Sequence, residues 1–190
     1  MDILLIRHGQ TNWNIEGRLQ GSTDIQLNEE GIMQAELCAQ FIKSVQLTTL
    51  ISSPLSRAKQ TAEIIARACH LPIIEMDAFR EKSFGDAEGL TQMERQEKYV
   101  TRPFPNEELF ESLKTRIFEG LNEIAQKYYD QKIAIVTHGG VINCILAVIS
   151  NGEVGTNKTI LHNASISTIR FEHNHFSIVD VNNIAYLTTV

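Results

Sequence analysis

The stretch Asp2-Ile3-Leu4-Leu5-Ile6-Arg7-His8-Gly9 decides the fold of this 190-residue chain. Its four consecutive apolar residues, followed at once by polar residues and a glycine, are typical of a buried strand in a parallel sheet. Ile133-Ala134-Ile135-Val136-Thr137-His138-Gly139-Gly140 repeats this order of buried strand, histidine and glycine. The sequence therefore predicts two similar strand ends, each of which presents a histidine.

Strand and helix patterns alternate in the rest of the chain. Apolar runs predict further strands near 47–51, 73–76, 165–171 and 175–180. Helices are expected to begin at the N-caps Asn28, Ser53 and Asn106, after Gly89, and near Gly140. Pro54 suits the first turn of the helix that Ser53 would cap. This alternation predicts an α/β layer fold around a mainly parallel sheet, and 190 residues fit one domain.

The composition excludes several classes of protein. A content of 43% hydrophobic and 21% charged residues is that of an ordinary globular protein, and no apolar run approaches membrane-spanning length. The net charge of −6 argues against nucleic-acid binding but not against an anionic small molecule, because a few arginines in one cleft set the local field. Cys38, Cys69 and Cys144 lie in apolar helical patterns without metal-ligand spacing. We therefore expect a cytoplasmic protein without a metal site.

Four cationic or titratable side chains are expected at one edge of the sheet. Ligands of open α/β sheets bind outside the carboxyl ends of the strands, so His8 and His138 face one crevice if their strands are neighbours. Arg7 precedes His8, and Arg57 lies in the first turn of the helix that follows another strand. The planar fork of arginine suits the oxygens of phosphate. The sequence therefore predicts a phosphoryl-binding site.

Six segments together resemble the histidine phosphatases, the superfamily that includes cofactor-dependent phosphoglycerate mutase. They follow the order of that family, span most of the chain and are highly specific in combination. The segments are Arg7-His8-Gly9-Gln10-Thr11-Asn12-Trp13-Asn14, Gly17-Arg18-Leu19-Gln20-Gly21, Leu27-Asn28-Glu29-Glu30-Gly31, Ser52-Ser53-Pro54-Leu55-Ser56-Arg57-Ala58, Glu81-Lys82-Ser83-Phe84-Gly85 with Glu88-Gly89, and Thr137-His138-Gly139-Gly140.

The resemblance implies a fold and a role for each matching residue. The fold is a three-layer α/β/α sandwich with a mainly parallel central sheet flanked by helices, in one domain over 1–190 with a small helical and loop cap at about 79–108. His8 would be the nucleophile and Glu81 the proton donor. Arg7, Arg57 and His138 would bind the phosphoryl group and stabilise the transition state. The other expected binding residues are Asn14, Gln20, Gly21 and Gly139.

A two-step mechanism follows from these roles. Neutral His8 attacks phosphorus while protonated Glu81 supplies the proton of the leaving group, and ionised Glu81 then activates the water that hydrolyses the phosphohistidine. No metal or other cofactor is expected, because Arg7, Arg57 and His138 supply the positive charge. Activity is expected to be highest on the acidic side of neutrality.

Three alternatives stay open beside a broad-specificity phosphatase acting on small phosphomonoesters. A phosphoglycerate mutase shares the core chemistry, but Gln10-Thr11 and the 17–21 motif are phosphatase-like. The stretch between Glu81 and Asn106 is also short and weakly basic, with Lys98 and Arg102 as its main cations. A narrow phosphatase of the α-ribazole type is a second alternative; the segments 102–108 and 151–159 favour the broad branch. A non-catalytic binding module is the third, although such a module is expected to lose its nucleophile or its acid.

Two further expectations concern the cap and the assembly. Phe84, Phe104 and Phe110 would give the cap an apolar lining suited to aryl or alkyl phosphates. The protein is expected to be a monomer or a homodimer, with no membrane or nucleic-acid partner.

Overall fold

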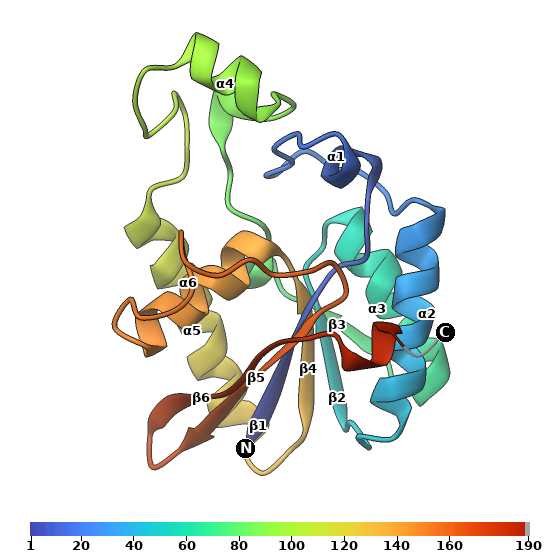
Figure 1. The fold of residues 1–190 in the computed structure, drawn as a ribbon. Coiled ribbons are helices and arrows are strands. Elements are labelled where there is room, and N and C mark those ends of the chain that lie inside the picture. The colour runs from blue at the N-terminus through green and yellow to red at the C-terminus, as the bar shows by residue number, and fades with distance from the viewer. Residues whose placement is uncertain (189–190) are drawn as a thin grey trace.

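A six-stranded sheet forms the centre of the computed structural model, which describes residues 1–188 (Figure 1). Neighbouring strands follow the order β3-β2-β4-β1-β5-β6. The first four of these are mutually parallel, whereas β5 runs antiparallel to both β1 and β6. The expected mainly parallel sheet is confirmed. The strand bounds are β1 Asp2–Arg7, β2 Thr49–Ser52, β3 Ile73–Glu75, β4 Ile133–Thr137, β5 Ile166–Glu172 and β6 His175–Asn183.

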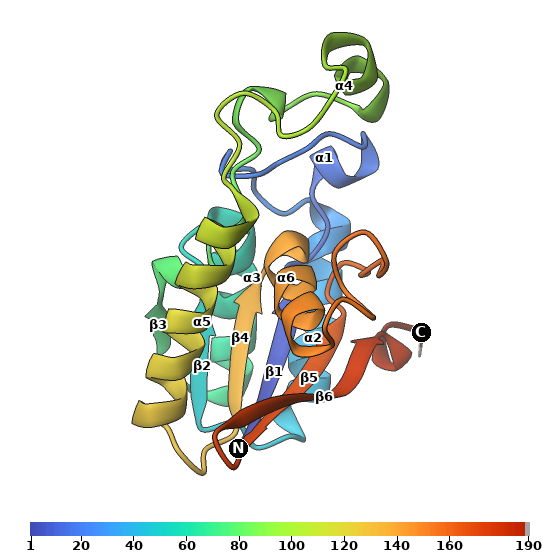
Figure 2. The ribbon, with the colours of Figure 1, turned by 90° about the vertical axis from the view of Figure 1, so that its left-hand side faces the viewer.

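Helices cover both faces of this sheet, as the three-layer expectation requires (Figures 1 and 2). Side chains alternate along a strand, so Ile3 and Leu5 pack toward α5 and α6 while Leu4 and Ile6 pack toward α2 and α3. The α-helices are α1 Asn12–Ile15, α2 Glu29–Lys43, α3 Ser56–Cys69, α4 Gln92–Lys98, α5 Phe110–Lys127 and α6 Gly139–Ile149. Short 3₁₀ turns lie at Asp77–Phe79, Gly85–Ala87 and Ala185–Thr188. In residues 1–188 we find no helix with the length and apolar character that a membrane span requires.

Two predicted N-caps are wrong, because each polar side chain has a tertiary partner instead. Helix α3 begins at Ser56 after Leu55, and the hydroxyl of Ser53 lies 2.7 Å from Nε2 of His138. Helix α5 begins at Phe110, and the amide of Asn106 donates to Asp86 at 3.0 Å. The predicted cap Asn28 is confirmed, since its side chain accepts the N–H of Gly31 at 2.8 Å.

Residues 9–27 contain a short helix, and two aromatic side chains of longer helices are partly exposed. Thr11 and Asn14 form a capping box, which fixes the start of the short helix α1. Phe41 of α2 is 37% exposed, and Phe110, which was expected to line the cap, is 39% exposed. Phe41 stacks on Tyr186 at the surface, and Phe110 is the first residue of its helix.

Residues 79–108, here called the cap segment, rise beyond the carboxyl ends of the parallel strands and carry α4 (Figures 1 and 2). Arg116 of α5 fastens both ends of this segment to the body. Its guanidinium donates to the carbonyls of Ala78 and Arg80 at 2.8 and 2.7 Å, and it pairs with Glu108 at 2.7 Å. A third bond, 3.2 Å long, reaches the carbonyl of Glu81. Both ends of the cap segment therefore contact one half-buried cation, Arg116.

Candidate active site

The ends of three neighbouring parallel strands bring the predicted site together. Arg7 of β1 pairs with Thr137 of β4, and the His8 N–H donates to the carbonyl of Thr137 at 2.9 Å. On the other side of β4, the Ser53 N–H after β2 donates to the carbonyl of Val136 at 2.9 Å. His8, His138 and Ser53 therefore lie in a row at the edge where open α/β sheets bind ligands.

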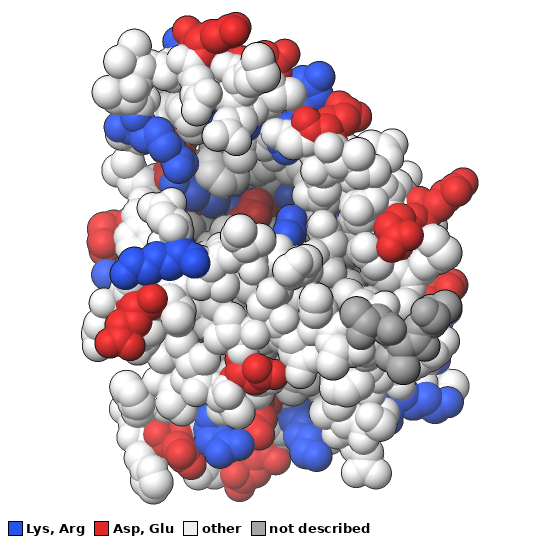
Figure 3. Space-filling model, in the orientation of Figure 1, with Lys and Arg blue, Asp and Glu red and all other residues white. Residues whose placement is uncertain are grey.

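A cavity of about 260 Å³ lies at this edge, beneath the cap segment. Figure 3 shows the surface hollowed there, with basic atoms on the walls and acidic atoms inside. His138 is fully buried behind it, with its ring centroid 5.2 Å from that of His8. The other eight residues predicted for the site line the cavity: Arg7, His8, Asn14, Gln20, Gly21, Arg57, Glu81 and Gly139.

The imidazole of His8 is held in one tautomer. Its Nδ1 lies 2.7 Å from the carbonyl oxygen of Gly9, and a carbonyl oxygen only accepts hydrogen bonds. The hydrogen is therefore on Nδ1, which leaves a lone pair on Nε2. Burial, together with the charges of Arg57 and Arg7, holds the pKa of His8 well below its ordinary value of 6.5. The lowered pKa favours the neutral ring, whose Nε2 keeps its lone pair.

His138 is anchored through its other nitrogen. Its Nε2 lies 2.7 Å from the Ser53 hydroxyl, whereas its Nδ1 has no hydrogen-bond partner among residues 1–188. The Ser53 oxygen already accepts the N–H of Leu55 at 3.3 Å. Burial and the nearby charge of Arg57 hold the pKa of His138 well below its ordinary value. If the hydroxyl donates to Nε2, this neutral ring offers an N–H at Nδ1.

Two buried guanidiniums supply the positive charge of the cavity. Arg57 is fully buried and donates to the carbonyls of Gly21 and Thr23 at 2.7 and 2.9 Å. Arg7 donates to the carbonyl of Leu161. Desolvation lowers the pKa of both arginines, yet a guanidinium stays charged in proteins. In the described part of the chain, Nε of each arginine lacks a hydrogen-bond partner. Such buried, unpaired donors favour an anionic ligand.

Glu81 lies opposite these cations and is held by two backbone groups. Its carboxylate accepts the N–H of Lys82 at 2.9 Å and the N–H of Gly140 at 3.1 Å. A Cβ atom at position 140 would lie 2.5 Å from Oε1 of Glu81, so a larger residue there would displace this carboxylate. Gly140 is absent from the predicted site, although its place directly after Gly139 is a signal that could have revealed it.

Glu88 is a second residue that sequence reasoning missed. Its carboxylate accepts the N–H groups of Ser22, Thr23 and Phe84 at 2.9, 2.9 and 3.0 Å. Although burial raises it, the pKa of Glu88 is held below its ordinary value by hydrogen bonds from Thr23, Ser22 and Phe84. Glu88 thus joins the cap segment to the turn whose carbonyls hold Arg57. The adjacent pair Glu88-Gly89 was the available signal.

The two predicted amides have different surroundings. Asn14 accepts hydrogen bonds from Thr11 and from Asn163, which also donates to the carbonyl of His8 at 3.1 Å. Gln20 is buried, and its side-chain oxygen has no partner within residues 1–188. In the described residues, no group of three or more His, Cys, Asp or Glu side chains could hold a metal ion.

Comparisons with known proteins agree with this geometry. The family model for the histidine phosphatase superfamily (branch 1) matches residues 3–184. The uncharacterized phosphatase PhoE of Bacillus subtilis (strain 168) is 41% identical over 186 residues, which cover 98% of this chain and 96% of that protein. The probable phosphoglycerate mutase GpmB of Proteus mirabilis (strain HI4320) is 29% identical over 207 residues, which cover 100% of this chain and 96% of the other.

A solved structure of a phosphatase has the same fold as this chain. It is that of a mutant phosphoserine phosphatase from Entamoeba histolytica in complex with phosphoserine, with a TM-score of 0.86 and 29% identity. The match covers 98% of each chain. The chain belongs to branch 1 of the histidine phosphatase superfamily.

Proposed function

We propose that the chain is a phosphohydrolase that removes phosphate from small phosphomonoesters through a phosphohistidine on His8. One observation carries the proposal. The bond between Nδ1 of His8 and the carbonyl of Gly9 leaves Nε2 as a neutral nucleophile, in a cavity that two buried guanidiniums make attractive to anions. The low pKa of His8 keeps this nucleophile neutral on the acidic side of neutrality, where the highest activity is expected.

In the first step, Nε2 of His8 attacks phosphorus and the bond from phosphorus to the ester oxygen breaks. Glu81, in its acid form, gives its proton to that oxygen, and the alcohol departs. Arg7 and Arg57 offset the charge on the equatorial oxygens, where most of the charge of this transition state resides. His138 adds a neutral N–H donor at Nδ1.

In the second step, the Glu81 carboxylate takes a proton from water while the water oxygen bonds to phosphorus. The P–N bond breaks, its electron pair returns to Nε2 of His8, and inorganic phosphate is released. The N–H groups of Lys82 and Gly140 hold the carboxylate in place for both proton transfers. Because Arg7, Arg57 and His138 provide the electrostatic stabilisation, the proposed reaction needs neither a metal ion nor another cofactor.

Hydrolysis is favoured over mutase chemistry by two observations. The relative named phosphatase PhoE is 41% identical to this chain, whereas relatives named probable phosphoglycerate mutase GpmB are 29% and 32% identical. The motifs at 10–11 and 17–21 are also of the phosphatase type. We place the protein in the cytoplasm, since Cys38, Cys69 and Cys144 form no disulfide within the described residues.

Rapid-quench trapping tests the proposal. The protein is mixed with p-nitrophenyl phosphate, quenched in alkali and digested, and phosphate is located by mass spectrometry. We expect an acid-labile, alkali-stable phosphate on His8. The variant His8→Ala should lose it together with turnover, while His175→Ala, which removes an exposed histidine of β6, should keep both. Near-normal turnover by His8→Ala, or phosphate on another residue, would contradict the proposal. Preferential transfer to a phosphoglycerate rather than to water would identify a mutase.

A further inference from the structure

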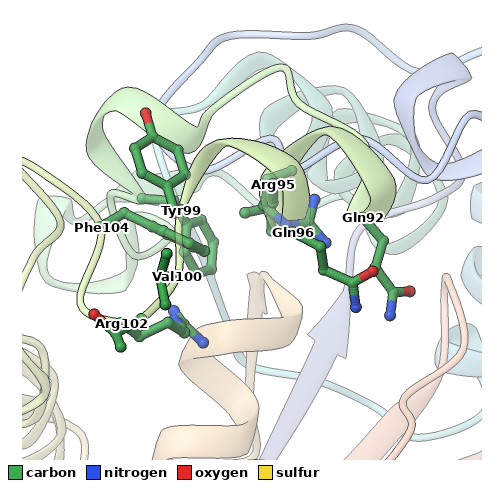
Figure 4. Close-up of a pocket in the computed structure, with 10 residues that line it drawn as sticks. Gln92, Arg95, Gln96, Tyr99, Val100, Arg102 and Phe104 are labelled. Atoms are coloured by element: carbon green, nitrogen blue, oxygen red, sulfur yellow. The ribbon is translucent and has the colours of Figure 1, made fainter.

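A second cavity, of about 340 Å³, adjoins the phosphate pocket inside the cap segment (Figure 4). The two cavities share two wall residues, Leu19 and Phe84. A substrate whose phosphate lies next to His8 can therefore extend past these side chains into the second cavity. The remaining lining residues are Gln92, Arg95, Gln96, Tyr99, Val100, Thr101, Arg102 and Phe104.

One part of this cavity is apolar and aromatic. Phe84, Tyr99 and Phe104 contribute rings to the lining, and the Tyr99 and Phe104 centroids are 5.2 Å apart. Figure 4 shows Tyr99, Val100 and Phe104 close together, with Arg102 beside them. Aromatic walls of this kind bind a flat or apolar group through its large contact area.

The other part is polar and positively charged. One face of α4 carries Gln92, Arg95 and Gln96, which follow the i, i+3, i+4 spacing of a helix. Gln92 and Gln96 offer amide donors, and no lining residue of this cavity carries a carboxylate. The helix thus presents polar and cationic groups toward the same space as the aromatic rings.

The charge balance leaves one lining cation without a carboxylate partner. Arg102 pairs with Glu107, whose side chain is 2% exposed and also pairs with Lys82 at 2.6 Å. Arg95 donates to the carbonyl of Leu90 at 2.7 Å but forms no ion pair within residues 1–188. Burial, and then the charge of Arg102, lower the pKa of Arg95, so the two cations repel each other. One negative charge on a ligand would relieve this repulsion.

We propose that the second cavity binds the leaving group of the substrate, and that this group carries a carboxylate on an apolar, planar body. The body packs against Phe84, Tyr99 and Phe104, and the carboxylate pairs with Arg95. This assignment rests on the proposed function, because a leaving group exists only if the phosphate pocket performs hydrolysis. A carboxylate, with one negative charge, matches the unpaired cation better than a second phosphate group would.

A pair of matched substrates tests the assignment. The first, 4-(2-carboxyethyl)phenyl phosphate, carries the carboxylate; the second, 4-(2-carbamoylethyl)phenyl phosphate, replaces it with a neutral amide of the same size. We expect kcat/KM to be about tenfold higher for the carboxylate, the effect of one charge-assisted hydrogen bond. Arg95→Gln should reduce this ratio to about one. Lys98→Gln removes an exposed cation of the same helix that does not line the cavity, and should keep the ratio.

Each outcome separates this assignment from the phosphatase proposal. Equal kcat/KM for the two esters in the wild-type protein, or an unchanged ratio in Arg95→Gln, would overturn the assignment while leaving phosphatase activity intact. A phosphonate analogue that outperforms the carboxylate would overturn the choice of a single negative charge. Absence of phosphate release from every ester would refute the proposed function itself. If Arg95→Gln does not fold, inhibition of the wild-type protein by 3-(4-hydroxyphenyl)propanoate is compared with inhibition by the corresponding amide. Stronger inhibition by the carboxylate is expected, and equal inhibition would contradict the assignment.

Discussion

Nε2 of His138 lies 2.7 Å from the hydroxyl oxygen of Ser53, and both side chains are completely buried. Ser53 follows β2 and His138 follows β4, so the bond joins the ends of two adjacent strands. When the Ser53 hydroxyl donates to Nε2, Nδ1 of His138 carries the N–H and can donate to a phosphoryl oxygen. Ser53 is therefore a positioning residue for His138 in the proposed reaction.

The variant Ser53→Ala is expected to lower kcat about tenfold with a smaller change in KM. Loss of the hydroxyl frees the ring to adopt the other tautomer, and a wrong tautomer removes the N–H that the transition state uses. The unpaired Nε2 should also cost about 1–3 kcal/mol of the free energy of unfolding. Steady-state kinetics and urea denaturation measure both effects. Ser53→Thr, which keeps a hydroxyl, should recover most of kcat; equal losses in the two variants would contradict this role.

Acid should destabilise the protein through His8 and His138. Their pKa values are well below 6.5 in the folded protein, while an unfolded histidine titrates near 6.5. Below about pH 6.5 the unfolded chain therefore binds protons that the folded protein excludes. As the pH is lowered below this value, the free energy of unfolding decreases by up to about 1.4 kcal/mol per pH unit for each histidine.

Urea denaturation between pH 5 and pH 8 measures this dependence. The double variant His8→Asn/His138→Asn should show a shallower slope below pH 6.5, because it lacks the two suppressed protonation sites. The double variant keeps the other four histidines, so the difference in slope between it and the wild type measures the contribution of His8 and His138 alone. An unchanged slope in the double variant would show that the acid sensitivity arises elsewhere.

Much of the site was predictable because its key residues follow buried strands. The apolar runs before His8 and His138 identify both strand ends, and the topology of parallel sheets predicts that adjacent strand ends share a site, although 130 positions separate the histidines. The local pattern at Ser53-Pro54 predicted an N-cap that the structure does not have. The Ser53 hydroxyl could have capped the helix, but it contacts His138 instead. The choice depends on His138, which is 85 residues away. Likewise, the sequence does not show that Glu107 pairs with Arg102, which leaves Arg95 as the lining cation without a carboxylate partner.

Glu88 contacts a turn that lies 66 positions earlier in the sequence, and this contact leads to a further prediction. Its carboxylate holds the backbone N–H groups of Ser22 and Thr23, and the carbonyls of Gly21 and Thr23 hold Arg57. Gly21 has a φ of +56°, and a Cβ there would lie 2.1 Å from Oε1 of Glu88. The carboxylate, the turn and the guanidinium therefore form one connected unit.

Glu88→Gln is expected to weaken the binding of inorganic phosphate, a competitive product inhibitor in the proposed reaction, by about tenfold. The amide keeps the shape of the side chain but turns one acceptor oxygen into an NH₂ group, which faces donors and leaves them unpaired. The 20–23 turn then loosens, and Arg57 loses the carbonyls that fix its orientation. The inhibition constant of phosphate measures the effect, with Glu97→Gln, an exposed position on α4, as the matched control. An equal inhibition constant in Glu88→Gln and wild type would show that Arg57 is oriented without Glu88.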